Sequence, residues 1–351
     1  MKVERVLIYR LGSLGDTIVS LPLLHLVARV FPNARRYALT NFISNNKASH
    51  MSAVLGNSGL IHEYMSYPQG LRDIRQLLKL RMKIKSIRPD VLVYLAASRG
   101  QITAFRDAIF FKSCGIRKLV GVPYTKDQQN SKWLPDNQCF EHESARLARC
   151  VSSLGDVRLE DVGSWDLHLT ELEKLKAQEG ASFIESCTPV IAVSVGAKVD
   201  VKNWGLLNWQ DLIANLSRNH GGAALLMFIG AESDFEDSEK VGQFWIGRKV
   251  NFCGALNPRE SAAALEKALI FIGHDSGPMH LAAAVGTPCV SIFSARNKPG
   301  VWFPYGVGHR VIYHKTDCFG CGLEICEREQ KKCITSIGVD EVLASVCELL
   351  N

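Results

Sequence analysis

RVLIYRLGSLGDTIVSLPLLHLVARVF, residues 5–31, is the stretch that decides the fold. Its short apolar start, Arg5–Tyr9, predicts a buried strand, and residues 17–31 have the apolar spacing of a helix. A loop with two glycines joins them. A strand that passes through a tight loop into a helix is the repeating unit of a parallel α/β sheet. We therefore expect such a sheet at the start of the chain.

The same alternation continues along the chain and predicts one parallel sheet in each half. We expect an α/β protein of two domains, residues 1–175 and 176–351, with the boundary falling between residues 169 and 188. Open α/β sheets bind ligands at the carboxyl ends of their strands, which predicts a cleft between the domains. Further strands are expected at residues 36–40, 91–95, 118–122, 190–195, 224–229, 270–273 and 289–293, and further helices around 209–218 and 278–285.

The composition is that of a globular protein of 351 residues, with 47% hydrophobic and 22% charged residues. It excludes disordered, collagen-like and coiled-coil proteins. No apolar run approaches the roughly 18 residues of a membrane-spanning helix, and the run at residues 6–9 is too short for a signal peptide. The eleven cysteines, an odd number, indicate a reducing compartment, so we expect a cytoplasmic protein.

The net charge of +6 is unevenly distributed along the chain. Residues 1–175 carry 25 Lys and Arg against 16 Asp and Glu, which gives +9, and the remainder carries −3. The first half should therefore face an anionic partner, such as a phosphorylated substrate or a membrane surface. No nucleic-acid partner is expected, because no zinc finger or RNA-recognition motif accompanies the charge.

Residues 71–88 interleave basic and apolar side chains as an amphipathic helix does. Two interpretations stay open. The apolar stripe packs on the first sheet while the charges are solvated, or the charges contact an anionic membrane or a phosphorylated lipid acceptor. Both can hold at once. The basic residues are Arg72, Arg75, Lys79, Arg81, Lys83, Lys85 and Arg88.

The first motif that could carry chemistry is the loop Gly12-Ser13-Leu14-Gly15-Asp16. Its glycines permit a tight turn and a close approach of the backbone to a ligand. Asp16 is expected at the N-cap of the following helix. There it either caps the helix or serves as a general base at the mouth of the cleft.

The second motif, HDSGPMHLAAA at residues 274–284, leads from a strand into a helix. Pro278 suits the first turn of that helix. The free N–H groups of Ser276, Gly277 and Met279, together with the helix dipole, predict an anion site that a diphosphate would occupy. The alternatives are an ordinary strand-to-helix turn and, for His280, a structural histidine.

Two further loops follow strands of the second half. A lysine in GAKVDVKNW, residues 196–204, can neutralise a departing phosphate without a metal, although Lys198 itself is better explained as a solvated surface lysine. In Gly230-Ala231-Glu232 a carboxylate at a strand end can accept hydrogen bonds from a ribose diol.

These motifs, in this order, resemble those of the heptosyltransferase family, glycosyltransferase family nine, over nearly the whole chain. The likeness lies in residues 10–22, 92–99, 141–155, 202–204 and 275–284. It implies a GT-B fold, an α/β architecture of two Rossmann-like domains whose parallel sheets face a central cleft. The donor nucleotide would bind the second domain, and the C-terminal helix would pack back on the first.

The resemblance also implies roles for single residues. Asp16 matches the catalytic base, Lys202 the phosphate-binding lysine and Glu232 the carboxylate on the ribose. The family commonly has threonine where Ser276 stands, and the exchange keeps the hydroxyl. The diphosphate loop and helix start match Asp275, Ser276, Gly277 and His280, with Ser13, Gly15 and Lys198 near the donor or acceptor.

The implied activity is an inverting sugar transfer, most directly of heptose from ADP-heptose. The acceptor would be a hydroxyl of a lipopolysaccharide-core-like anionic glycan or glycolipid, met in the cytoplasm or peripherally at the inner membrane. No cofactor is expected, because Lys202 and the helix amides offset the charge of the leaving diphosphate. The alternatives are a protein or natural-product acceptor with another nucleotide sugar, a nucleotide-sugar epimerase, and a non-catalytic nucleotide-sugar binding protein.

Four cysteines, Cys318, Cys321, Cys326 and Cys333, lie close together in the sequence. In a cytosolic chain such a cluster predicts a structural zinc or iron site, and a similar cluster recurs in the resembling family. The alternative is a loop of reduced thiols, because the gap between the last two cysteines is wider than a second C-x-x-C.

Overall fold

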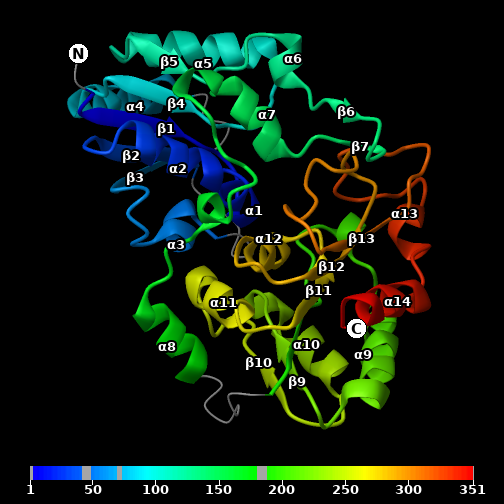
Figure 1. Cartoon of the computed structure of the whole chain (residues 1–351). Helices are drawn as coiled ribbons and strands as arrows, with labels where there is room; N and C mark the ends of the chain where they lie inside the picture. The colour runs from blue at the N-terminus through cyan, green and yellow to red at the C-terminus, as the bar shows by residue number, and fades with distance from the viewer. Residues whose placement is uncertain (1–2, 42–48, 69–72, 180–187, 351) are drawn as a thin grey trace. The chain divides into compact units, whose positions relative to one another are not determined.

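The structure, a computed structural model, describes residues 3–41, 49–68, 73–179 and 188–350 (Figure 1). The chain forms two compact units, residues 1–168 and 169–351. Each unit is built on its own parallel sheet. The strand-and-helix alternation in the sequence therefore predicted the layer type of both units.

The sheet of the first unit has the strand order β3-β2-β1-β4-β5, and every neighbouring pair is parallel. The chain runs outward from β1 to one edge and then returns to add strands beyond β1 on the other side. The order therefore reverses between β1 and β4. The strands are β1 (Arg5–Tyr9), β2 (Arg35–Asn41), β3 (Glu63–Tyr67), β4 (Val91–Tyr94) and β5 (Lys118–Val120).

Helices cover this sheet, and the helix expected at residues 17–31 is split in two. Pro22 has no N–H to continue a helix, so the chain makes a tight turn at Ser20 and starts again. A two-stranded ribbon, β6 (Trp133–Leu134) with β7 (Cys139–Phe140), lies outside the sheet. The helices are α1 (Leu14–Ile18), α2 (Leu21–Val30), α3 (Met51–Leu55), α4 (Ile74–Ile87), α5 (Gln101–Ser113), α6 (Lys126–Gln129) and α7 (Glu143–Cys150).

The sheet of the second unit repeats the plan with the order β10-β9-β8-β11-β12-β13, again all parallel. Here the order reverses between β8 and β11. The strands are β8 (Val190–Ser194), β9 (Leu225–Phe228), β10 (Lys249–Asn251), β11 (Ile270–His274), β12 (Cys289–Phe293) and β13 (Arg310–Tyr313).

The helices of the second unit show where it begins and how it is closed. The unit begins at Leu169, at the start of the expected boundary range of residues 169–188, because α8 packs on α11 and Glu173 pairs with the buried Arg259 at 2.5 Å. The C-terminal helix α14 packs on α9, β11 and β12 of its own unit. The helices are α8 (Glu171–Glu179), α9 (Leu206–His220), α10 (Phe235–Gly242), α11 (Pro258–Leu265), α12 (Gly277–Ala284), α13 (Lys332–Thr335) and α14 (Val339–Leu350).

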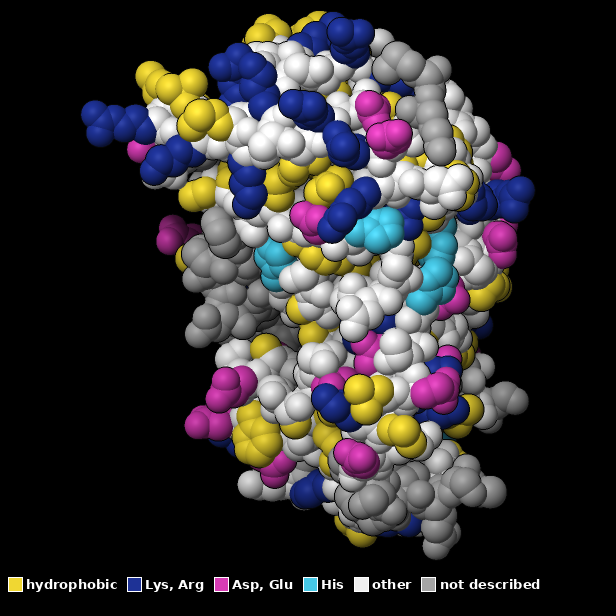
Figure 2. Space-filling view, turned by 90° about the vertical axis from the view of Figure 1, so that its left-hand side faces the viewer, with side chains coloured by type: hydrophobic (Ala, Val, Ile, Leu, Met, Phe, Trp, Pro, Cys, Tyr) yellow, Lys and Arg dark blue, Asp and Glu magenta, His cyan; other side chains and the backbone are white. Residues whose placement is uncertain are grey.

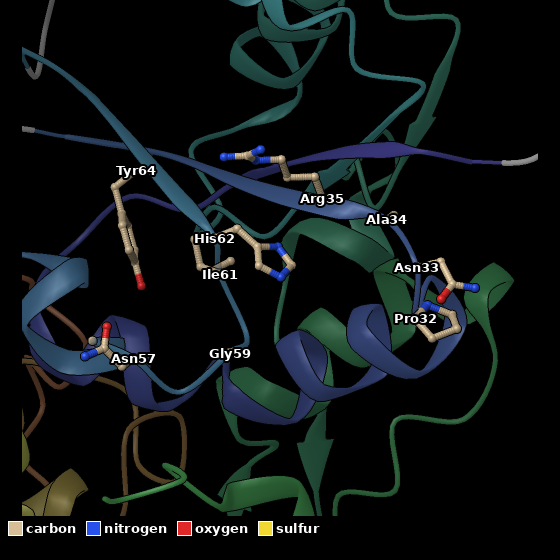
Figure 3. A pocket seen from close by; sticks show the side chains of 10 residues that line it. Pro32, Asn33, Ala34, Arg35, Asn57, Gly59, Ile61, His62 and Tyr64 are labelled. Carbon is tan, nitrogen blue, oxygen red and sulfur yellow. The ribbon is translucent and has the colours of Figure 1, made fainter.

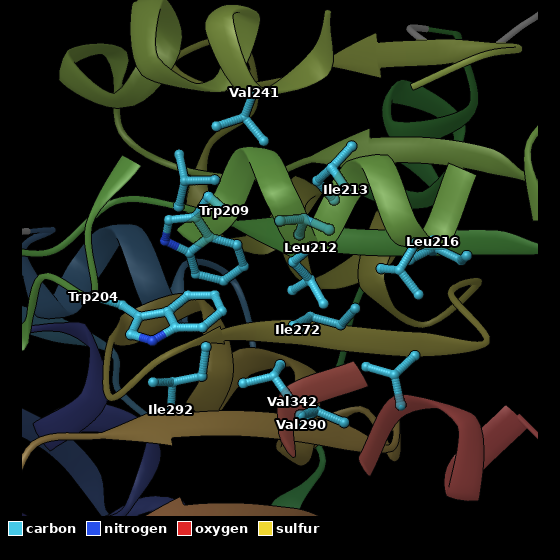
Figure 4. Packing of buried hydrophobic residues seen from close by; sticks show 14 of the residues in the cluster. Trp204, Trp209, Leu212, Ile213, Leu216, Val241, Ile272, Val290, Ile292 and Val342 are labelled. Carbon is cyan, nitrogen blue, oxygen red and sulfur yellow. The ribbon is translucent and has the colours of Figure 1, made fainter. Parts of the chain in front are cut away.

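The core of the second unit joins α9 and α14 to the sheet (Figure 4). Trp204 and Trp209 stand edge to face, with ring centroids 5.2 Å apart, at the end of this core nearest the strand-end loops. The Trp204 indole N–H donates to the Ile337 carbonyl at 2.9 Å, so its polar atom is satisfied. The loop that carries Lys202 is thereby anchored in the hydrophobic core. No helix in the described part of the chain is long and apolar enough to span a bilayer.

Replacing Leu212, which is fully buried in this core, with Ala should lower the free energy of unfolding by about 2–5 kcal/mol. The matched control is Leu207→Ala on the same helix. Leu207 is 76% exposed, so its loss should change stability by less than about 0.5 kcal/mol. Urea denaturation followed by tryptophan fluorescence measures both. Equal losses in the two variants would contradict the assigned packing of α9.

Candidate functional site

The Gly12–Asp16 loop follows β1 at the point where the strand order of the first sheet reverses. Ligands of open α/β sheets bind at such points, outside the carboxyl ends of the strands. The structure corrects one detail of the sequence prediction. Ser13 is the N-cap of α1, and Asp16 is the third residue of the helix. From there its carboxylate accepts the Ser13 N–H at 2.9 Å.

The buried Arg10 side chain holds Asp16 in place. This arginine is 1% exposed, and its Nε and Nη2 donate to the carbonyl and the carboxylate of Asp16 at 2.8 and 3.4 Å. Its Nη1 donates to the Leu95 carbonyl, beyond the end of β4, at 2.6 Å. Gly12 has a φ of +124°, and a Cβ there would collide with the Asp16 side chain. The loop thus fixes one carboxylate, which remains 25% exposed, at the carboxyl end of the central strand β1.

A polar cluster beside this loop was not singled out from the sequence. The Nη2 of Arg99 donates to the hydroxyls of Tyr9 and Tyr94 at 3.2 and 3.0 Å and to Asp107 at 2.6 Å. The Tyr9 hydroxyl also lies 2.7 Å from that of Tyr67. Burial raises the pKa of all three phenols, so they remain neutral hydrogen-bonding groups.

The Arg99 side chain is 34% exposed at the carboxyl edge of β4. Within the described ranges, its Nε and Nη1 groups have no acceptor, because all three of its hydrogen bonds come from Nη2. The guanidinium is therefore held on one side and open on the other. The signal in the sequence was weak, since the partners of Arg99 are spread from residue 9 to residue 107.

In the second unit, Lys202 and Asp275 form a buried ion pair between β8 and β11, where the strand order reverses. Lys202 follows β8 and Asp275 follows β11, two strands that are neighbours in the sheet. The Lys202 Nζ lies 2.7 Å from the Asp275 carboxylate and donates to its carbonyl at 2.9 Å. Asn297, after β12, donates to the same carboxylate at 3.1 Å. The structure thus brings together two residues that the sequence placed in one donor site.

His274 fixes the Lys202 loop from inside the domain. Its Nε2 accepts the Trp204 N–H, so its Nδ1 carries the proton and donates to the Gly196 carbonyl, both at 3.1 Å. Burial lowers the pKa of His274 to about 4, with a further contribution from the nearby charge of Lys202. The imidazole is therefore neutral at physiological pH and joins the loops that follow β8 and β11.

The start of α12 directly follows Asp275 in the chain. Ser276 is the N-cap, Gly277 begins the helix and Pro278 lies in its first turn. The Ser276 hydroxyl oxygen is buried and, among the residues described, has no hydrogen-bond partner. The first N–H groups of a helix have no partner within the helix. An anion bound here would satisfy both the hydroxyl and the amides.

Glu232 follows β9, the strand on the far side of β8, and is exposed in a short 3-10 turn (Glu232–Asp234). Three glycines make this corner compact. A Cβ on Gly196 or Gly230 would collide with Asp234, and one on Gly254 would collide with Glu232. The carboxylate of Glu232 therefore lies, like Lys202, at the carboxyl ends of the strands of this sheet.

The positions of the remaining predicted residues neither support nor exclude a role in binding. Lys198 is exposed, in agreement with a solvated lysine. Gly15 and Ser13 are half-buried in the loop that holds Asp16. His280 is buried on α12, with its ring edge to face with that of Trp302 at 6.3 Å, as a structural histidine would be.

The predicted metal site at the cysteine cluster is not formed. Cys318, Cys321, Cys326 and Cys333 are all free thiols. Within the described residues, no three His, Cys, Asp or Glu side chains are grouped to hold a metal ion. Cys318 and Cys321 are exposed, and Cys326 and Cys333 are half-buried. The described arrangement therefore gives the predicted metal site no support.

A cavity of about 690 Å³ opens elsewhere on the first unit, at the amino ends of β2 and β3 (Figure 3). Tyr64 and Asn57 face each other at one side of it, and Pro32 and Asn33 lie at the other. Arg35 at its rim is already paired with Glu63. The cavity lies at the opposite end of the strands from Asp16 and contains none of the predicted site residues.

The neutral state of buried His274 predicts how stability depends on pH. Between about pH 6.5 and 4 the unfolded chain binds a proton that the native imidazole does not, so stability falls as pH falls. His274 alone should cost roughly 2–3 kcal/mol between pH 7.5 and pH 4.5. The His274→Gln variant, measured by urea denaturation over this range, should lose that part of the slope. Identical slopes in the two proteins would contradict the assignment.

Comparison with known proteins agrees with this geometry. The family model described as glycosyltransferase family 9 (heptosyltransferase) matches residues 103–331. The lipopolysaccharide core heptosyltransferase OpsX of Haemophilus influenzae is 20% identical over 296 residues, which are 83% of this chain and 79% of that protein.

Two solved structures share the fold over almost their whole length. The glycosyl transferase family 9 structure from Veillonella parvula has a TM-score of 0.74 at 18% identity and covers 100% of this chain and 98% of that one. E. coli ADP-heptose lps heptosyltransferase II has a TM-score of 0.67 at 17% identity and covers 99% and 98%. The predicted GT-B fold of two Rossmann-like domains is confirmed. The chain therefore belongs to glycosyltransferase family 9, the heptosyltransferase family, and is a glycosyltransferase.

Proposed function

We propose that this protein is an inverting heptosyltransferase that moves heptose from ADP-heptose to a hydroxyl of a lipopolysaccharide-core acceptor. The family membership, the activity of the Haemophilus relative and the ADP-heptose named for the E. coli structure support this proposal. The observation that carries it is the Lys202–Asp275 pair next to Ser276 at the start of α12. The buried Ser276 hydroxyl has no hydrogen-bond partner among the described residues.

The donor diphosphate binds at the start of α12. Lys202 uses hydrogen bonds to Asp275 to hold its ammonium in place, and its third N–H remains for a phosphate oxygen. Ser276 and the Gly277 amide supply further donors. Glu232 accepts from the ribose hydroxyls. These groups stabilise the negative charge that develops on the leaving ADP, and we propose that no metal is needed for it.

Asp16 takes the proton of the acceptor. The acceptor oxygen attacks the anomeric carbon from the face opposite the diphosphate, the bond from that carbon to the phosphate oxygen breaks, and the anomeric configuration inverts. The proton of the attacking hydroxyl passes to the Asp16 carboxylate. Arg10 and the Ser13 N–H hold that carboxylate in one orientation, which lowers the entropic cost of the transfer.

The acceptor binds the carboxyl edge of the first sheet. Arg99, fixed on one side by two tyrosine hydroxyls and Asp107, directs its free donors to an anionic group of the acceptor. A lipid-linked acceptor would place the reaction at the cytoplasmic face of the inner membrane, with the enzyme bound peripherally.

Replacing Asp16 with Asn should lower turnover by about 10²–10⁴-fold while ADP binding stays unchanged, because the amide keeps the shape but cannot accept the proton. The matched control is Asp161→Asn, another carboxylate of the first unit that accepts a backbone N–H in a turn. Acceptor-dependent ADP release measures turnover. Release at the wild-type rate by Asp16→Asn would contradict its role as the base, and ADP release without any acceptor product would contradict sugar transfer.

ADP-heptose should raise the melting temperature by about 5–10 °C at a hundredfold excess over its Kd, and UDP- and GDP-sugars should raise it less. The Lys202→Met variant should lose most of this shift relative to its own unliganded melting temperature, whereas Lys240→Met, an exposed lysine, should keep it. The Lys202→Arg variant keeps the positive charge and should keep part of the shift. A full shift in Lys202→Met would contradict the proposed contact with the diphosphate, and a preference for UDP-sugars would contradict the donor.

A further inference from the structure

Two neighbouring helices of the first unit each present an apolar stripe to solvent. On α4 the exposed side chains are Ile74, Leu78 and Met82, at 71%, 48% and 62%. The spacing of four residues places them along one side of the helix. The core contact of this helix is made by Ile84 instead, with Leu80 and Ile87 partly buried. The apolar stripe of α4 is thus not the face that packs on the sheet.

Helix α5 repeats this arrangement beside α4. Its buried side is formed by Ala104, Ala108 and Phe111, which contact the sheet. Its outer side carries Ile102, Phe105 and Ile109, which are 88%, 52% and 69% exposed. The two helices are in contact, and the Arg81 Nε on α4 donates to the Ser113 carbonyl at the end of α5 at 3.0 Å. We call the six exposed apolar residues of α4 and α5 the outer surface.

The outer surface is surrounded by positive charge. Helix α4 carries five basic and no acidic side chains, and residues 74–118 together carry eleven Lys and Arg against two Asp. One of those two, Asp107, is buried and paired with Arg99 and Arg106. Figure 2 shows Lys and Arg side chains interleaved with hydrophobic ones in the upper part of the face on which Figure 1 draws α4.

We propose that the outer surface docks this protein on an anionic lipid membrane. Exposed large apolar side chains gathered on adjacent elements mark an interaction surface, whereas scattered single ones do not. Apolar side chains among lysines and arginines match the interface of an anionic bilayer, where the apolar groups enter the acyl boundary and the cations meet the headgroups.

The charge argues for a membrane over a second copy of the chain. A copy would bring the same five basic side chains of α4 to the interface, and like charges facing each other oppose association. The choice of a membrane as the partner rests on the proposed function in one respect. A lipid-linked acceptor would lie in a membrane, so the enzyme would have to reach it there. The surface itself depends on no feature of the donor site.

Vesicle sedimentation of the full chain tests the proposal. The protein should sediment with vesicles of equal parts phosphatidylcholine and phosphatidylglycerol, and far less with vesicles of phosphatidylcholine alone. Removing three cations should lower the partition coefficient by about a hundredfold, since each contributes about fivefold. Replacing two outer isoleucines should lower it by about tenfold or more. The charge variant is Arg75→Gln, Lys79→Gln and Lys83→Gln, and the apolar variant is Ile102→Gln and Ile109→Gln.

Matched controls in the second unit separate this surface from general effects of charge and hydrophobicity. Leu207→Gln with Ile246→Gln removes two apolar side chains that are each 76% exposed. A triple change of exposed cations, Lys240→Gln, Lys267→Gln and Arg328→Gln, removes an equal charge. Both control variants should sediment like the wild type.

Three results would overturn the proposal. The first two are equal sedimentation with both vesicle types and equal losses in the test and control variants. The third is a wild-type protein that binds no vesicles but forms a dimer in sedimentation velocity, when the apolar variant is a monomer. The melting-temperature shift with ADP-heptose and transfer to a soluble acceptor fragment should be normal in every variant. A failure of membrane docking is therefore distinguishable from a failure of the proposed activity.

Discussion

The buried pair of Lys202 with Asp275 is the interaction on which the loops of the second unit depend. Two buried charges are costly unless each finds well-placed partners, and here Asn297 completes the shell of the carboxylate. Removing either charge would leave the other unpaired in a site only a few per cent to 15% exposed. The pair therefore holds the β8 loop against the β11 loop, and the start of α12 is positioned as a consequence.

The first domain uses the same device at the same topological position. Arg10, after β1, donates to the Leu95 carbonyl beyond β4 and to Asp16, just as Lys202, after β8, donates to the backbone and carboxylate of Asp275 beyond β11. In each sheet a buried cation bridges the two loops at the reversal of strand order. An open α/β sheet leaves a gap there, and the cation keeps it at a fixed width with one carboxylate at its edge.

The sequence predicted the central strands and the motif residues, and it missed features that depend on distant contacts. Strands such as β1, β8 and β11 are apolar on both faces and stand out as runs, whereas edge strands such as β10 (Lys249–Asn251) and β13 are short and carry charged residues. The Arg99 cluster gathers side chains from four separate elements, so no local pattern revealed it. The pairing of Lys202 with Asp275, 73 residues apart, was equally invisible before the fold was known.

Helix α4 shows why an amphipathic pattern does not by itself identify the buried face. Leu71 and Arg72 of the predicted stretch lie outside the described residues, and in the remainder the apolar side chains form two sides of the helix. The sheet beneath is already covered by Ala104, Ala108 and Phe111 of α5, so one turn of α4 around Ile84 suffices to close the core. Burying the second stripe as well would require another layer of protein over α4. The stripe stays exposed instead, with lysines and arginines on the same helix. Helix α4 therefore carries more apolar surface than the core uses, and this exposed surface is available for an external partner.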